Sequence, residues 1–269
     1  MFINHIFHIL SQHLYKQPAG SYLKYFMKSH GTLFALSFLL ILTSCETLNQ
    51  TAQVLNQSIG TPSATEIALG LKQALEVGTD QSTKRLHAKN GFLQNSAVKI
   101  LFPPEAQKIE TTLRSLGLSD LCDQVVTSLN RAAEDAVAEA APIFVAAIRQ
   151  MSISDASSIL FSNQTDAATQ YFKNTTQAQL TEKFRPQIQS SLSKVGATRY
   201  WSDVVNRYNQ LPLVNRINPD LAGYVTQKTI EGLFVEISKE ELQIRQSLSA
   251  RSTTLLQKVF GYADRQRPH

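Results

Sequence analysis

From Ser63 onward, apolar residues recur at the three- and four-residue spacing of helices. Ser63 and Glu66 match the capping-box pattern that starts a helix, and the apolar positions that follow predict a helix over residues 64–77. A second helix is expected to open at Pro104 and to end at Gly117. The same spacing predicts four helices toward the C-terminus, at residues 175–194, 198–209, 219–246 and 250–260.

The middle of the chain is rich in alanine. A long helix is predicted to begin near Ser119 and to kink at Pro142, because proline lacks the N–H that a helical hydrogen bond needs. Its many alanines favour close approach of neighbouring backbones, so we expect it to be a central packing element. Further on, Asp155 and Asp166 each precede a similar short segment, and each Asp is expected to cap a short helix.

One segment has the alternation of a strand instead. Residues 98–102 form a short alternating stretch, downstream of a predicted turn at residues 90–91. A single strand cannot form a sheet, so the sequence predicts an all-α fold: a compact, multi-helix, bundle-like domain, with at most one short strand or hairpin near residues 92–102. We expect this single domain to span residues 63–262 and to be followed by a polar tail, residues 263–269.

The stretch FLLILTSCE, which ends at Glu46, marks the boundary of an export signal. The apolar run of residues 32–42 is shorter than the roughly 20 residues that a membrane-spanning helix needs, and Lys28 precedes it, as in a signal peptide. The residues before Cys45 resemble the bacterial lipobox. We therefore expect residues 1–44 to be a leader and signal peptide, with translation starting at Met27. The alternative is an uncleaved core helix.

The lipobox resemblance implies that Cys45 is lipidated and that residues 45–62 form a polar tether, because several acyl chains make a firm membrane anchor. In lipoproteins of this type an Asp after the Cys favours retention at the inner membrane. Glu46 therefore favours the outer membrane, with the domain at the periplasmic face of the cell envelope.

Removal of the leader changes the charge and the candidate chemistry. Of 26 basic residues, three precede Cys45, which leaves 23 against 21 acidic ones and gives no case for nucleic-acid binding. Only His87 and His269 follow Cys45, so a His-rich zinc site cannot be built, and a Ser-His-Asp triad would have to use His87. Cys122 has no partner for an internal disulfide, and we interpret it as a small buried residue.

Several long phrases resemble the uncharacterised bacterial family known as domain of unknown function 4197, over residues 66–261. They are LNRAAEDAVAEAAPIF, DASSILFSNQTDAATQYF, LAGYVTQKTIEGLF and EELQIRQSLSARSTTLLQKVFG. The resemblance implies a helical, exported protein. It implies no activity and no site residue, so candidate chemistry must come from the residues themselves.

A carboxylate on an apolar helix face needs a partner, and Glu241 lies in the apolar stripe of the predicted 219–246 helix. One hypothesis is that Glu241, with Glu240, faces Arg131 and Glu134 across a groove and forms a polar site for a ligand or for acid and base catalysis.

The alternative hypothesis is structural: Glu241 pairs with Arg245 at i+4, or with Arg251, and holds one helix against another. We therefore expect a membrane-anchored periplasmic lipoprotein that acts as a non-enzymatic helical binding or envelope-assembly module, without metal or cofactor. Its partners would be the membrane, through Cys45, and an envelope protein or small ligand. The alternative function is a small carboxylate-dependent hydrolase.

Overall fold

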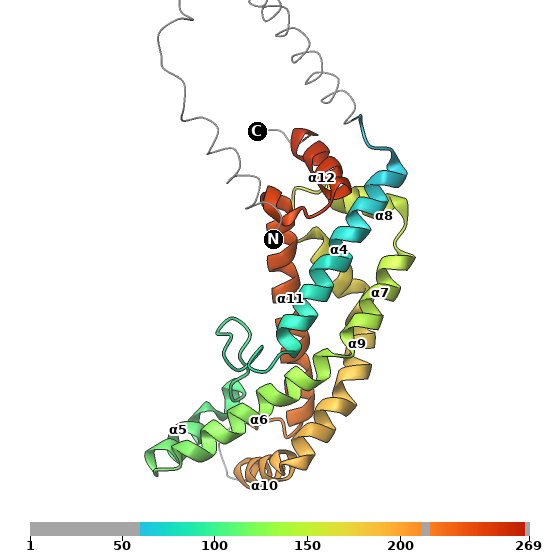
Figure 1. Ribbon diagram of the computed structural model, residues 1–269. Helices are drawn as coiled ribbons and strands as arrows, with labels where there is room; N and C mark the ends of the chain where they lie inside the picture. The colour runs from blue at the N-terminus through green and yellow to red at the C-terminus, as the bar shows by residue number, and fades with distance from the viewer. Residues whose placement is uncertain (1–59, 211–215, 267–269) are drawn as a thin grey trace, which may run out of the picture. The chain divides into compact units, whose positions relative to one another are not determined.

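The computed structural model describes residues 60–210 and 216–266, so the predicted leader, Cys45 and the tether up to residue 59 lie outside the described residues. The described part contains nine α-helices, two short 3-10 helices and no strand (Figure 1). The α-helices are α4 (Ala64–His87), α5 (Gln107–Ser115), α6 (Ser119–Val137), α7 (Ala140–Gln150), α8 (Ile153–Leu160), α9 (Ala167–Lys194), α10 (Ala197–Asn209), α11 (Leu221–Gln246) and α12 (Thr254–Gln266); the 3-10 helices are η1 (Pro104–Ala106) and η2 (Leu248–Ala250).

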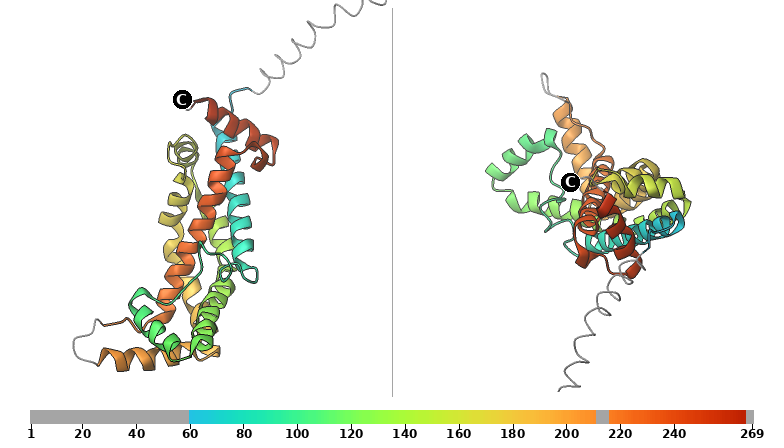
Figure 2. Two further views of the ribbon diagram at one scale, coloured as in Figure 1. Left: turned by 90° about the vertical axis from the view of Figure 1, so that its left-hand side faces the viewer. Right: turned by 90° about the horizontal axis from the view of Figure 1, so that it is seen from above.

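The chain from Thr61 onward is one compact unit. Within it, α11 packs against α9 and α4, and α7 packs against both α4 and α9 (Figures 1 and 2). Helices α5, α6 and α10 gather at one end of these long helices, and α8 and α12 at the other. The prediction of an all-α, bundle-like domain is therefore confirmed.

Aromatic side chains connect three of the long helices. The rings of Phe144 on α7 and Phe172 on α9 lie 5.2 Å apart, and Phe234 on α11 lies 6.4 Å from Phe144. All three side chains are buried. Large apolar surfaces removed from water in this way are the main stabilising contribution to the fold.

Helix α4 is longer than predicted, because its last turns use small polar residues where the first turns use apolar ones. Gly78, Thr79, Ser82 and Thr83 are buried on the same helix. The Thr79 hydroxyl donates to the carbonyl of Leu75, 2.7 Å away, so its polar group is satisfied within the helix. The hydrophobic pattern in the sequence ends at residue 77, whereas the buried face of α4 continues to Leu86.

The Ala-rich segment forms two helices, so the prediction of one helix kinked at Pro142 is wrong. Helix α6 ends at Val137, and α7 begins at Ala140. Pro142 therefore lies in the first turn of α7, where backbone N–H groups have no acceptor within the helix. The chain breaks before the proline because Pro142 has no N–H to donate to the preceding turn.

The two expected caps differ from each other. Ser152 caps α8, and Asp155 is the third helical residue of a capping box. Asp166 precedes α9, but its carboxylate accepts from the Gln170 side chain at 2.9 Å and from no backbone N–H of α9. Helix α9 then continues to Lys194, so the expected short helix and the expected 175–194 helix are one. Its buried stripe repeats every four residues: Phe172, Thr176, Leu180, Phe184, Ile188 and Leu192.

The predicted strand near residues 92–102 is absent from the described residues. Val98, Ile100 and Phe102 are buried in alternation, as the sequence indicates, but no second strand pairs with them. The Ile100 N–H instead donates to Asn130 Oδ1 at 2.9 Å, and Asn130 Nδ2 donates to the Ile100 carbonyl at 2.7 Å. One buried side chain on α6 therefore replaces the hydrogen bonds that a neighbouring strand would provide.

Other helix ends lie near their predicted positions. Helix α5 ends just before Gly117, which has the positive φ of 80° that glycine accepts readily. Helices α10 and α11 begin and end within two residues of the prediction. Helix α12 extends to Gln266, beyond the predicted residue 260, and Ala263 is buried on it.

Candidate functional site

Glu241 and Arg245 form a buried ion pair on α11. Glu241 is 7% exposed and Arg245 is 4% exposed. The Nη2 atom of Arg245 lies 2.8 Å from Oε1 of Glu241. The Glu241 carboxylate also accepts from the backbone N–H groups of Ala168 and Thr169, each at 2.9 Å, and from the Thr169 hydroxyl at 2.8 Å. Arg245 donates to the carbonyl of Ile159 at 2.9 Å. The pair therefore connects α11 to the end of α8 and the start of α9.

The negative charge of Glu241 lies at a helix N-terminus and the positive charge of Arg245 at a helix C-terminus, and the helix dipole stabilises each of them there. The carboxylate of Glu241 accepts from N–H groups at the N-terminus of α9, and the guanidinium of Arg245 donates to the Ile159 carbonyl at the C-terminus of α8. The neighbouring cavity, lined by Leu71, Ile237 and the pair itself, has a volume of about 20 Å³, which is room for about one water. The arrangement is that of a structural support.

Arg251 contacts the same, C-terminal end of α11. Its Nε and Nη2 atoms donate to the carbonyls of Ile244 and Arg245 at 3.0 and 2.8 Å, and its Nη2 lies 2.7 Å from Asp264 Oδ2. Its guanidinium also lies over the Phe260 ring. Arg251 therefore contacts the backbone at the C-terminus of α11, and no described ion pair joins it to Glu241.

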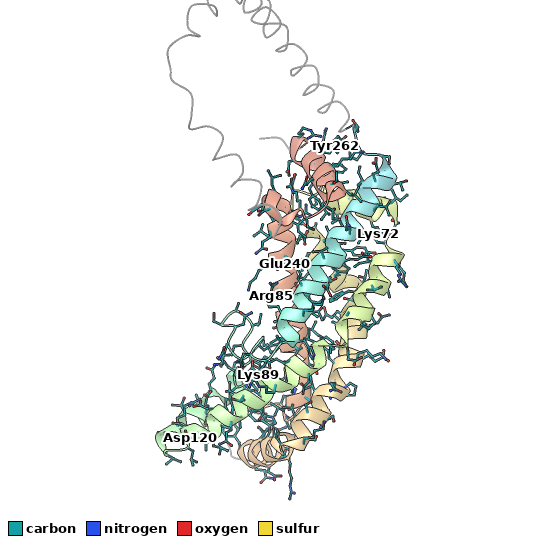
Figure 3. The ribbon with its side chains drawn as sticks, in the orientation of Figure 1. Lys72, Arg85, Lys89, Asp120, Glu240 and Tyr262 are labelled. Carbon is teal, nitrogen blue, oxygen red and sulfur yellow. The ribbon has the colours of Figure 1, made fainter. Side chains whose placement is uncertain are left out.

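A second network joins α4 to α11. Arg85 contacts Glu240, and Arg85 Nε lies 3.1 Å from Glu236 Oε2 (Figure 3 shows Arg85 and Glu240). Burial alone would raise the pKa of Glu236, but hydrogen bonds from Lys239 and Asn95 and the charges of Lys239 and Arg85 bring it below its ordinary value. Glu236 and Glu240 are four residues apart on α11, so their negative charges repel each other. Arg85 contacts both carboxylates, and its positive charge offsets this repulsion.

A third network holds the irregular segment that follows α4. Glu134, on α6, accepts from the backbone N–H groups of Phe92 and Leu93 at 3.1 and 3.2 Å, and it also pairs with Arg131. Arg131 Nη2 donates to Asn90 Oδ1 at 2.7 Å, and Asn90 has the positive φ of 72°. Glu134 and Arg131 thus add side-chain hydrogen bonds to a turn whose backbone bonds include Gly91 N–H to the Ala88 carbonyl at 2.8 Å.

The residues of the predicted polar site consequently belong to three networks: Glu241 with Arg245, Glu240 with Arg85, and Glu134 with Arg131. No described hydrogen bond or ion pair joins Glu241 to the Arg131 network. The i+4 pairing of the structural alternative is present. Sequence reasoning missed Arg85, which is 155 residues from Glu240 along the chain.

His87 and Cys122, the two other residues considered for catalysis, show no arrangement typical of a catalytic site. His87 is exposed, and its Nδ1 lies 2.8 Å from the Glu134 carbonyl. Cys122 is buried, and burial raises the pKa of its thiol, which disfavours the reactive thiolate. Within residues 60–210 and 216–266, no three His, Cys, Asp or Glu side chains gather as a metal site would require, and no helix is long and apolar enough to span a bilayer.

Glu66 makes one pH-dependent contact between helices. It closes the capping box of α4 and accepts from Lys258 of α12 at 2.6 Å. The hydrogen bond from Lys258, followed by that from Ser63, lowers the pKa of Glu66 from 4.5 to about 2. Because the folded-state pKa lies below the unfolded one, the contact stabilises the fold above about pH 4.5 and is lost as the pH falls through about 2.

We therefore expect wild type to melt at a higher temperature than Glu66→Gln above pH 5, and this difference to disappear as the pH falls to about 2. Thermal melting of the two proteins between pH 2 and pH 7 measures it. A difference that grows on acidification would contradict the role assigned to the Glu66 carboxylate.

A large groove lies between the antiparallel helices α9 and α11, which lie side by side in Figure 2. Its cavity volume is about 820 Å³. Polar and charged side chains dominate the lining, which we call the α9–α11 groove: Asp166, Thr169, Gln170, Lys173, Gln177, Thr181, Arg185, Gly223, Thr226, Gln227, Ile230, Glu231, Phe234, Val235, Ser238 and Lys239. This groove could not be predicted from the sequence, because a polar face on a helix is typical of solvent exposure.

A family model described as protein of unknown function (DUF4197) matches residues 61–261 of the chain. No curated protein and no solved structure matches it. The matched residues contain all three charged networks and both helices of the groove.

Proposed function

Because the chain belongs to the family of proteins of unknown function DUF4197, whose description names no activity, we propose from its own residues that it is a membrane-anchored, non-enzymatic binding module of the bacterial cell envelope. The α9–α11 groove is its binding surface. The single observation that carries this proposal is the size and chemistry of the groove.

The groove is as large as known ligand-binding pockets, and most of the residues that line it are polar or charged. Known pockets for small ligands range over about 300–1,000 Å³, and this groove, at about 820 Å³, lies within that range. Its walls carry amides, hydroxyls and charges at successive helical turns, such as Lys173, Gln177 and Thr181 on α9. Such side chains offer both donors and acceptors to a polar ligand.

The carboxylates outside the groove support binding over catalysis. Glu134, Glu236, Glu240 and Glu241 are each buried and each accept hydrogen bonds from arginine, lysine or backbone donors. The hydrogen bonds of these carboxylates therefore connect parts of the fold to one another. No described feature favours the carboxylate-dependent hydrolase, so we propose only the binding function.

The anchor in this proposal is lipid attached to Cys45, which would place the domain at the periplasmic face of the envelope, on the outer membrane. Its support is the order of Lys28, an apolar run and Cys45 in the sequence. Metabolic labelling with a fatty acid tests it: wild type should incorporate the label, whereas Cys45→Ser should not. Labelling of the Cys45→Ser protein would refute the anchor.

Two valines allow a matched test of the groove. Val235 lines the groove on α11 and is 40% exposed, whereas Val145 lies on α7, outside the groove, and is 38% exposed. We expect Val235→Arg to block the groove and Val145→Arg to leave it open, with neither change unfolding the protein, because both side chains are on the surface.

The measurement is thermal melting of the purified full chain against a library of envelope peptides, glycans and metabolites. A ligand present at about 100 times its Kd adds about 2.7 kcal/mol to the free energy of unfolding. A compound that stabilises wild type and Val145→Arg, but not Val235→Arg, is the expected result. Equal stabilisation of all three proteins would place the binding site outside the groove.

A further inference from the structure

We propose that the α9–α11 groove binds an extended, acidic peptide segment of a protein partner, and that Lys173 contacts a carboxylate of that peptide. This inference rests on the binding function proposed above and names the ligand class. The length of the groove, the chemistry of its walls and the pairing of its charges support this ligand class.

The groove is long and open-sided, which suits a chain better than a compact molecule. Its lining on α9 runs from Asp166 to Arg185, which is about 28 Å at 1.5 Å per helical residue. An extended peptide covers this length with about eight residues, at 3.3 Å each. The α11 wall runs antiparallel over about 24 Å, from Lys239 to Gly223.

The walls have the donors and acceptors that a peptide backbone needs. Gln177 on α9 has an amide with two donors and an acceptor oxygen. Gln170 on α9 and Gln227 on α11 each donate one N–H to Asp166 or Glu231, and each keeps a second N–H and an acceptor oxygen. Backbone N–H and C=O groups of an extended chain alternate, so amide side chains can satisfy both kinds. No sheet edge is present among the described helices, so side chains rather than a strand must provide these bonds.

Two other occupants fit the lining less well. An amphipathic helix needs a row of apolar anchor sites, but among the apolar lining residues only Val235 is exposed, while Ile230 and Phe234 are buried. A glycan would gain from stacking on an aromatic face, and the one aromatic lining residue, Phe234, is 6% exposed. An extended peptide needs neither feature.

The charges of the groove identify Lys173 as the contact for an anion. Arg185 lies 2.9 Å from Asp220, and Lys239 lies 2.6 Å from Glu236, so both cations already have partners. Lys173 is exposed and takes part in none of the ion pairs of the described residues. Its ammonium group, with three donors, therefore lines the groove without a direct ion pair, and its charge acts on Glu231 across the groove.

Glu231, on the opposite wall, sets the side on which the acidic residue binds. Its carboxylate accepts from Lys228 at 2.7 Å and from Gln227 at 2.9 Å. Burial alone would raise the pKa of Glu231, but these hydrogen bonds and the charges of Lys228 and Lys173 lower it, so the group stays ionised. A peptide carboxylate would be repelled by Glu231, so it is expected on the α9 side, against Lys173.

The test is affinity selection from a random octapeptide library, with the full chain purified in detergent as bait. Wild type is compared with Lys173→Gln and with Lys183→Gln, since Lys183 is an exposed lysine of α9 that does not line the groove. We expect wild type and Lys183→Gln to enrich peptides that contain Asp or Glu, and Lys173→Gln to lose this preference. For a selected peptide, Lys173→Gln should weaken binding about fivefold at low salt.

Each other result overturns the inference in a distinct way. Enrichment of peptides without Asp or Glu, with loss of binding in Val235→Arg, would keep the groove as a binding site but exclude recognition of carboxylates. If no peptide is enriched while polygalacturonate, a carboxylate-bearing glycan, binds wild type and not Val235→Arg, the ligand is a glycan. If neither probe responds to Val235→Arg, the proposed function of the groove fails as well.

Discussion

Glu241→Gln is expected to lower the free energy of unfolding by about 3–5 kcal/mol, because it leaves the buried guanidinium of Arg245 without its carboxylate. The amide of the variant has one acceptor oxygen, whereas the carboxylate accepts from Arg245, Ala168 and Thr169 together. Chemical denaturation of wild type and variant measures the difference.

A double-mutant cycle isolates the pair. Arg245→Met removes the buried charge, so Glu241→Gln/Arg245→Met should lose clearly less than the sum of the two single changes. Glu231→Gln, an exposed change on the same helix, should lose no more than about 1 kcal/mol. If the two single changes add without coupling, the ion pair does not contribute as a unit and the structural interpretation of Glu241 is wrong.

Asn130→Ala is expected to lower the free energy of unfolding by about 2–4 kcal/mol, because it leaves the N–H and the carbonyl of Ile100 buried and unpaired. The cost is that of two backbone groups that lose their partners, since alanine has neither a donor nor an acceptor. Urea unfolding, followed by circular dichroism, measures it.

A second readout separates this effect from general destabilisation. Hydrogen exchange at the Ile100 amide should accelerate more than exchange at amides inside α9 and α11, because its hydrogen bond to Asn130 is removed directly. The exposed Asn174 on α9 provides the control, and Asn174→Ala should change stability by no more than about 0.5 kcal/mol. Equal effects at Asn130 and Asn174 would contradict the role of Asn130.

Local signals in the sequence predicted the helix ends that depend on local chemistry. Ser63 and Glu66 form their capping box, and Gly117 takes the left-handed conformation that ends α5. The predictions that were wrong, for the end of α4 and for a strand near residue 100, concern segments whose structure depends on tertiary contacts. The buried part of α4 around Thr79 is polar, and the hydrogen bonds of Ile100 come from a side chain 30 residues away. Neither feature leaves a periodic pattern in the sequence.

The same division applies to the charged residues. The spacing of Glu241 and Arg245 on one helix predicted their pairing, because residues four apart face each other. The contacts of Glu241 with Thr169 and of Glu240 with Arg85 depend on how distant helices pack, which one sequence does not determine. The groove arises from two ordinary polar helix faces and becomes visible only when α9 and α11 lie side by side.

The buried charges are proposed to maintain the fold, and the α9–α11 groove is proposed to bind the ligand. Ligand-induced thermal melting of Glu241→Gln and Val235→Arg tests both proposals in one measurement, with a compound that stabilises wild type. We expect Glu241→Gln to melt at a lower temperature than wild type but still to be stabilised by the compound, whereas Val235→Arg should melt like wild type and gain nothing from it. Loss of the response in Glu241→Gln together with its retention in Val235→Arg would contradict both proposals and place the binding site at the buried ion pair.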